Sequence, residues 1–221
     1  MTKTVIKFCG ITSIDDYKFI NDQEDVDFIG LIFTEKSPRS LNVEQAEKIL
    51  KSYNKQKSVV GVFMDQSKQC IQDTINNVDL DILQFHGQET VDFCRSFDKP
   101  FIKTFHVNES LISIQHDFCE YADYFLYDSS VNGKLGGTGE IFNWDLLAEH
   151  LSPLNSLHEK PYFVAGGLNI NNIGNLISEI MPYGIDVSSG LESSIGKKDH
   201  LLMKKFIENV RISEKENYEK N

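Results

Sequence analysis

The stretch FIGLIFTEKSPRSLNVEQAEKILKSY, residues 28–53, contains the unit from which the whole fold is built. It begins with a continuous apolar run, 28–33, which is typical of a parallel β-strand covered on both faces. A polar loop follows, and a helical pattern then occupies residues 42–53. The stretch therefore predicts one strand, one loop and one helix.

The same unit recurs along the chain, where apolar runs rich in Val, Ile and Phe each precede a helical pattern. The expected strands are residues 5–9, 28–33, 58–63, 81–85, 100–105, 123–127, 161–165 and 184–189. The expected helices are residues 13–22, 42–53, 67–78, 88–97, 109–122, 143–151, 169–181 and 198–212. Ser13, followed by Asp16, is placed to cap the first helix, and Asn171 to cap the seventh.

Eight such units without a linker predict an α/β protein with one (β/α)8 TIM barrel, residues 1–213. An open, doubly wound parallel sheet is the alternative. The number of units and the length of 221 residues favour closure of the barrel. Residues 214–221 carry almost no apolar side chains, and we expect this charged tail to fray.

The composition is that of a soluble globular protein, with 40% hydrophobic and 25% charged residues. There is no apolar run near the roughly 18 residues of a membrane span, and we expect a cytoplasmic protein. The formal net charge of −11 argues against a broad nucleic-acid or membrane surface, although a pocket can still be locally positive. Four widely spaced cysteines show neither a CxxC motif nor zinc-ligand spacing, so we expect free thiols.

In a TIM barrel the chemistry belongs to the loops that follow the strands. Cys9 ends the first strand, where a thiol can be a reagent instead of a small packed hydrophobe. Arg39 lies in the loop after the second strand, and its guanidinium suits a carboxylate; the alternative is an ordinary surface arginine. Arg95 and Arg211 fall on expected helices, where solvated side chains are the default.

The fourth and sixth strands also end in polar residues. Gln84 and His86 share one strand parity, so both can face the barrel mouth or bond to neighbouring loops. Asp128 follows an aromatic strand and can serve as a general acid or cap the following turn.

Glycine-rich loops follow the last three strands. Glycine lets backbone N–H groups approach a ligand, and the seventh and eighth loops of TIM barrels frequently bind phosphate, so the alternative of three tight turns is less favoured. The loop after the sixth strand contains Gly133, Gly136, Gly137, Thr138 and Gly139, and the two later loops contain Gly166, Gly167, Ser188, Ser189 and Gly190.

Lys7 shares parity with Cys9 and should point into the barrel one layer below it. A buried ammonium needs a partner, and Asp186 on the eighth strand is the adjacent candidate. We therefore predict a Lys7–Asp186 ion pair. Together with the N-terminus of the first helix, Lys7 is expected to lower the pKa of Cys9.

The motifs KFCGIT, SPRSL, QFHG, DSSVNGKLGGTGEIFNW, FVAGGLN and DVSSGLESSIGKKD together closely resemble the phosphoribosylanthranilate isomerase family of tryptophan biosynthesis. They occur in the family's order, from the first strand to the last helix. The resemblance implies an Amadori rearrangement of N-(5-phosphoribosyl)anthranilate to 1-(2-carboxyphenylamino)-1-deoxyribulose 5-phosphate. It implies no cofactor, no metal, a phosphorylated small-molecule substrate, and a monomer or homodimer.

The resemblance also assigns roles to single residues. Cys9 corresponds to the general base, Asp128 to the general acid and Arg39 to the arginine that holds the anthranilate carboxylate. The phosphate-binding amides correspond to Gly166, Gly167, Ser188, Ser189 and Gly190, and further substrate contacts are expected at Gln84, His86, Gly137 and Thr138. Departures from the family pattern occur at Glu140, Ile141, Asn143 and Ile195 and concern the loops near the phosphate.

Two other functions compete with this interpretation. The sugar-phosphate isomerase of histidine biosynthesis catalyses a similar rearrangement. That family has an aspartate where Cys9 stands and a phosphate site in each half-barrel, whereas the glycine-rich loops of this chain lie only in its second half. A barrel that binds a phosphorylated ligand without turning it over is the second alternative, against which the joint presence of Cys9, Arg39 and Asp128 argues.

Overall fold

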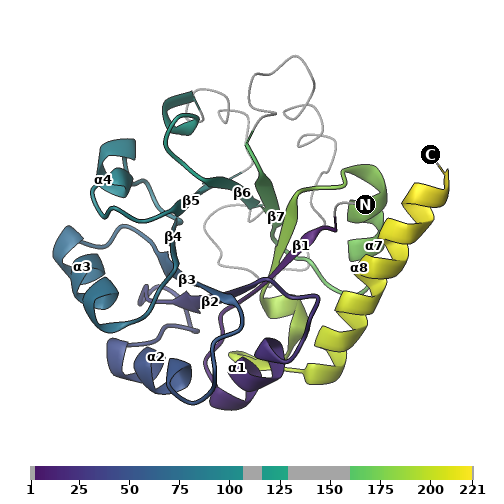
Figure 1. The fold of residues 1–221 in the computed structure, drawn as a ribbon, viewed down its shortest axis with the longest axis horizontal. Helices are drawn as coiled ribbons and strands as arrows, with labels where there is room; N and C mark the ends of the chain where they lie inside the picture. Colours follow the sequence, from purple (N-terminus) through teal and green to yellow (C-terminus); the bar gives the residue numbers. More distant parts are fainter. Residues whose placement is uncertain (1–2, 107–115, 129–159, 221) are drawn as a thin grey trace.

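The computed structural model describes residues 3–106, 116–128 and 160–220, and its strands close into a parallel barrel (Figure 1). Each strand pairs with the next, and the eighth pairs with the first. The predicted TIM barrel is therefore confirmed over the open sheet. The strands are β1 (Val5–Cys9), β2 (Phe28–Ile32), β3 (Ser58–Phe63), β4 (Ile82–Phe85), β5 (Phe101–His106), β6 (Tyr124–Asp128), β7 (Tyr162–Ala165) and β8 (Gly184–Val187).

Helices surround the barrel on its outside (Figure 1). The helix expected at 143–151 lies outside the described residues, as does the first half of the one expected at 109–122. Within 116–122 the chain forms a 3-10 turn instead of an α-helix, and Cys119 lies just after it. The described helices are α1 (Ile14–Asn21), α2 (Val43–Leu50), α3 (Lys68–Asn77), α4 (Val91–Arg95), η1 (His116–Phe118), α7 (Ile173–Glu179), η4 (Ser189–Leu191) and α8 (His200–Lys220). None of these helices is both long and apolar enough to cross a membrane.

One of the two predicted helix caps is confirmed. The Ser13 hydroxyl accepts a hydrogen bond from the backbone N–H of Asp16, as predicted for α1. The prediction that Asn171 caps α7 is wrong, because α7 begins one residue later, after Asn172. The Asn172 amide oxygen instead accepts from the backbone N–H of Asn169, within the preceding turn.

The barrel has an apolar interior that is separate from the layer between strands and helices. Alternate strand residues point inward, and this parity continues to the C-terminal ends of the strands. The polar side chains at those ends therefore face the mouth of the barrel. The interior contains Phe28, Val60, Ile82, Ile102, Leu126, Phe163 and Ala165.

Gly30, on β2, makes room for two side chains of β1. It is the register partner of Cys9. A Cβ atom at Gly30 would lie 2.7 Å from the sulfur of Cys9 and 3.1 Å from the ammonium of Lys7. Position 30 therefore requires glycine if both β1 side chains are to keep their places.

The C-terminal segment that the sequence predicts to fray continues α8 as far as Lys220 (the long yellow helix of Figure 1). The reason is an anchor: the buried carboxylate of Glu214 accepts a 2.5 Å hydrogen bond from the backbone N–H of Thr4. Arg211 donates to the same carboxylate and to Asp25. Arg211, expected to be solvated, thus ties α8 to the start of the chain.

We predict that Glu214→Ala destabilises the protein by about 1–3 kcal/mol, because the buried N–H of Thr4 loses its acceptor. Amide hydrogens of residues 215–219 should also exchange faster. Urea unfolding and hydrogen exchange measure the two effects, with the exposed Glu216→Ala as the matched control. Equal unfolding midpoints for the two variants would contradict the proposed anchor.

Candidate active site

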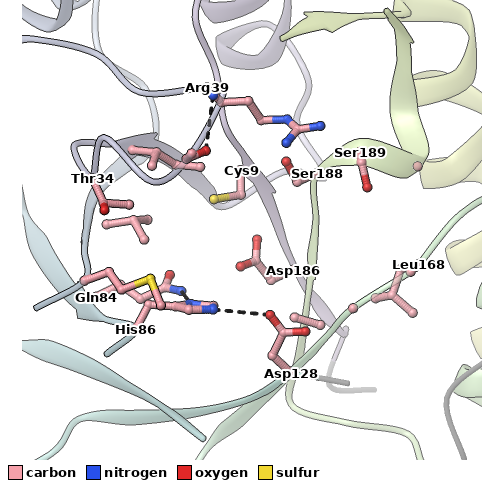
Figure 2. A pocket seen from close by; sticks show the side chains of 18 of the residues that line it. Cys9, Thr34, Arg39, Gln84, His86, Asp128, Leu168, Asp186, Ser188 and Ser189 are labelled. Atoms are coloured by element: carbon pink, nitrogen blue, oxygen red, sulfur yellow. Dashed lines mark hydrogen bonds and ion pairs between the residues drawn. The ribbon is translucent and has the colours of Figure 1, made fainter. Parts of the chain in front are cut away.

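One cavity opens at the C-terminal ends of the strands (Figure 2). It brings together residues from loops that are far apart in the sequence. Gly137 and Thr138, predicted as substrate contacts, lie outside the described residues. The other predicted site residues all line this cavity, namely Cys9, Arg39, Gln84, His86, Asp128, Gly166, Gly167, Ser188, Ser189 and Gly190.

Cys9 is the last residue of β1 and is almost fully buried beneath this cavity. Burial raises the pKa of its thiol, because the interior disfavours the thiolate; Lys7 opposes this shift and Asp186 adds to it. The expectation of a lowered pKa is therefore wrong. Burial favours a neutral thiol next to the Lys7 ammonium group.

Lys7 and Asp186 form the predicted ion pair, with 2.8 Å between the Lys7 nitrogen and Asp186 Oδ2. Burial disfavours the charged lysine, but Asp186 and Cys9 outweigh burial, so the pKa of Lys7 is raised and it remains an ammonium. The other Asp186 oxygen, Oδ1, is buried and has no hydrogen-bond partner among the described residues. Asp186 is one of the residues that line the cavity.

Arg39 is fixed by a carboxylate that the sequence analysis did not identify. Its Nε and Nη2 atoms each donate a 2.6 Å hydrogen bond to one oxygen of Glu192. Glu192 begins a small hairpin of β9 (Glu192–Ser194) and β10 (Lys197–Lys198), and the buried Lys198 ammonium also donates to it, at 2.9 Å. Burial opposes the charged form of Glu192, but Arg39 and Lys198 outweigh it and hold the pKa of Glu192 below its usual range.

The pairing with Glu192 leaves part of the Arg39 guanidinium available. It uses the Nε–Nη2 edge, whereas a guanidinium has a second edge formed by Nη1 and Nη2. A second carboxylate can therefore bind side by side with Glu192. Figure 2 shows the guanidinium beside Ser188, at the cavity wall.

His86 and Asp128 approach each other across the mouth, with 3.4 Å between His86 Nε2 and Asp128 Oδ2 (Figure 2). Gln84 lies beneath them, and its amide nitrogen is 3.4 Å from His86 Nδ1. His106, the register partner of Asp128 on β5, also lines the cavity. His106 was not predicted, because the strand was expected to end one residue earlier. Since His106 lies two residues after Thr104, it points to the same side of the strand.

Glycine is favoured in the seventh loop and in the eighth loop for different structural reasons. Gly166 and Gly167 adopt φ values of +95° and +63°, which favour glycine. A Cβ atom at Gly190 would lie 1.9 Å from the carbonyl oxygen of Leu168, so the two loops approach too closely for any side chain there. Phosphate binding by their backbone amides stays a prediction.

The sequence matches one family model, described as N-(5'-phosphoribosyl)anthranilate (PRA) isomerase, over residues 6–209. The N-(5'-phosphoribosyl)anthranilate isomerase of Legionella pneumophila (strain Paris) is 41% identical over 207 residues, covering 93% of this chain and 96% of the relative. That of Pseudomonas fluorescens (strain SBW25) is also 41% identical, over 209 residues, covering 94% of this chain and 95% of the relative.

Solved structures show the same similarity. Phosphoribosyl anthranilate isomerase from Thermotoga maritima superposes with a TM-score of 0.82 and 31% identity, covering 94% of this chain and 98% of the other. A phosphoribosyl anthranilate isomerase in complex with reduced 1-(o-carboxyphenylamino)-1-deoxyribulose 5-phosphate gives a TM-score of 0.76 and 29% identity, with the same coverage.

Alkylation tests the environment of the Cys9 thiol. In a Cys70→Ser background, which removes the exposed thiol, iodoacetamide should modify Cys9 slowly at neutral pH and faster as the pH rises, since only the thiolate reacts. Lys7→Met should slow the reaction at a given pH, and Asp186→Asn should accelerate it, because the two charges shift the pKa of Cys9 in opposite directions. Peptide mass spectrometry follows the rate; acceleration in both variants would indicate loosened packing and contradict this electrostatic account.

Proposed function

The chain belongs to the N-(5'-phosphoribosyl)anthranilate isomerase family, and on this premise we propose how its side chains carry out the family's reaction. The protein is an isomerase of tryptophan biosynthesis that converts N-(5'-phosphoribosyl)anthranilate to 1-(2-carboxyphenylamino)-1-deoxyribulose 5-phosphate. The observation that best supports the residue roles is that Cys9, Arg39, Asp128 and two glycine-rich loops line one cavity.

The rearrangement needs one acid and one base. We assign the acid to Asp128, which delivers a proton to the ring oxygen of the furanose and opens the ring to an iminium ion. The iminium acidifies the hydrogen on C2, which Cys9 then removes as the general base. The resulting enolamine tautomerises to the ketose. Cys9 and Asp128 come from β1 and β6, with two strands between them on the shorter way round, so they can act on different atoms of one substrate.

Lys7 is the group that makes a thiol usable as this base. Burial favours the neutral thiol, whereas Lys7 favours the thiolate. The iminium formed in the first step adds a second positive charge near the sulfur. The thiol therefore releases its proton to solvent in the cavity most easily after Asp128 has acted, and the resulting thiolate then takes the hydrogen from C2, which places the steps in order.

The two anionic ends of the substrate fit the two ends of the cavity. We assign the anthranilate carboxylate to the Nη1–Nη2 edge of Arg39, with Glu192 fixing the plane of the guanidinium. We assign the phosphate to backbone N–H groups of the seventh and eighth loops. The residues proposed to bind the phosphate are Gly166, Gly167, Ser188, Ser189 and Gly190. Gln84 and His86 are proposed to contact the part of the substrate between its two anionic ends.

The remaining expectations are also proposals. We propose that the enzyme works in the cytoplasm as a monomer or homodimer and that its rearrangement uses no cofactor. Four free cysteines are consistent with a reducing compartment. A structure of monomers generated from the dimeric enzyme of Thermotoga maritima makes a dimer a reasonable candidate. Sedimentation of the purified chain distinguishes the two oligomeric states.

Replacement of the acid or the base tests the mechanism. Cys9→Ser and Asp128→Asn should each lower kcat at least about 10²-fold, because a hydroxyl is a much weaker base than a thiolate and an amide cannot donate the proton. Both variants should still bind the reduced product analogue, which calorimetry measures. Turnover follows from the loss of substrate fluorescence. Wild-type kcat in Cys9→Ser would make the thiol structural.

Arg39→Ala should lower kcat/KM by about ten- to a hundredfold, mainly through KM, since a charge-assisted pair contributes about 1.5–3 kcal/mol. Glu192→Gln should have a smaller effect in the same direction, because the guanidinium keeps its charge but loses a fixed orientation. Arg95→Ala is the matched control, as this half-exposed arginine packs on Tyr121 outside the cavity. An unchanged KM in Arg39→Ala would remove this residue from the carboxylate site.

A further inference from the structure

Three side chains that can bind metal ions meet at the barrel mouth: His86, which follows β4, His106, at the end of β5, and Asp128, at the end of β6. One potential ligand atom from each lies within 4.8 Å of the other two. We propose that these side chains form a site for a divalent transition-metal ion such as Zn²⁺, and that the bound ion inhibits the isomerase. The inhibition rests on the proposed function of Asp128, whereas the binding does not.

The distances suit a zinc-sized ion. Ligand atoms about 2.0–2.2 Å from a tetrahedral Zn²⁺ lie about 3.3–3.6 Å from each other. His86 Nε2 and Asp128 Oδ2 are already 3.4 Å apart. The rings of His86 and His106 have centroids 5.3 Å apart and are inclined at 73°, so small rotations bring their nitrogens toward one point without stacking the rings.

The ligand types narrow the choice of metal. Two imidazoles and one carboxylate favour Zn²⁺, Co²⁺ or Ni²⁺ over Mg²⁺ or Ca²⁺, which prefer oxygen ligands alone. All three side chains are partly exposed to the cavity, so an ion can reach them from solvent. Three protein ligands leave a fourth tetrahedral position open to water or to an anionic ligand.

Gln84 lies beside His86, where its amide can orient the imidazole ring. A histidine that binds metal through Nε2 carries its proton on Nδ1 and needs an acceptor there. The Gln84 amide lies against His86 Nδ1, and its Oε1 atom is buried without a hydrogen-bond partner among the described residues. Turning this amide by 180° presents Oε1 to Nδ1–H, while the Thr104 hydroxyl, now 3.3 Å from the amide nitrogen, can donate to the same oxygen.

Occupation of this site would block catalysis in a defined way. Asp128, as a metal ligand, is an anion and has no proton to deliver to the ring oxygen. The ion also fills part of the cavity, so inhibition should be competitive with substrate. Cys9 lies outside the ligand set, which allows binding to be tested without the thiol.

Co²⁺ is a suitable probe because its visible absorption reports its coordination. In a Cys70→Ser background, we expect the protein to bind one Co²⁺ per chain with tetrahedral d–d bands and without a thiolate charge-transfer band. Zn²⁺ should displace the Co²⁺ and inhibit turnover competitively. His106→Gln should weaken Co²⁺ binding at least about tenfold, and His86→Gln likewise, with folding of both checked by circular dichroism.

The matched control is His200→Gln, because His200 lies on α8, outside the cavity, and is hydrogen-bonded to Asp16. This variant should bind Co²⁺ as tightly as the parent. Absence of d–d bands, or unchanged affinity in folded His106→Gln, would overturn the site. A thiolate band that disappears in Cys9→Ser would also overturn it, by making Cys9 the ligand. Site-specific binding without inhibition would overturn the inhibitory role and point to an error in the role of Asp128.

Discussion

The buried pair of Lys7 and Asp186 is the interaction on which the rest of the structure depends. These residues are direct register partners on β1 and β8, the two strands whose pairing closes the barrel. Two charges inside a barrel are tolerated only if they remain paired, because an isolated buried ion costs several kcal/mol. The same pair places an ammonium beneath Cys9, and Gly30 on β2 provides the space. The Lys7–Asp186 ion pair thus joins the two strands that close the barrel and also sets the charge beneath Cys9.

Cationic side chains are gathered near the cavity, although the chain as a whole carries a negative net charge. The formal net charge is −11, yet Arg39 lines the cavity, and two buried lysines, Lys7 and Lys198, lie close behind it. Their partners, Asp186 and Glu192, reduce the cost of burying them and fix their positions. No described residue bonds to Asp186 Oδ1, and the pairing with Glu192 uses only one edge of the Arg39 guanidinium. Asp186 and Arg39 both line the cavity.

Periodicity explains what could be predicted from the sequence. A strand alternates with period two, so parity placed Lys7 and Cys9 in the barrel, and the pairing of the eighth strand with the first made Asp186 the predicted partner of Lys7. Contacts between a loop and a later hairpin have no such period, which is why the bond from Arg39 to Glu192, 153 residues away, was not predicted. The anchoring of α8 through Glu214 and Thr4 was missed for the same reason, at a separation of 210 residues. The composition of residues 214–221 predicts a frayed tail, whereas the structure continues α8 to Lys220 and buries the carboxylate of Glu214 against Thr4.

The proposed base is a thiol, which the buried surroundings of position 9 accommodate better than a carboxylate. An ionised carboxylate at position 9 would share Lys7 with Asp186, giving two negative charges and one positive charge in a buried space. Cys9 avoids this excess, because burial and Asp186 keep its thiol neutral until a further positive charge arrives. In the proposed mechanism that charge is the iminium made by Asp128. The raised pKa of Cys9 is therefore compatible with its role as a base and restricts proton removal to the moment when the ring is open.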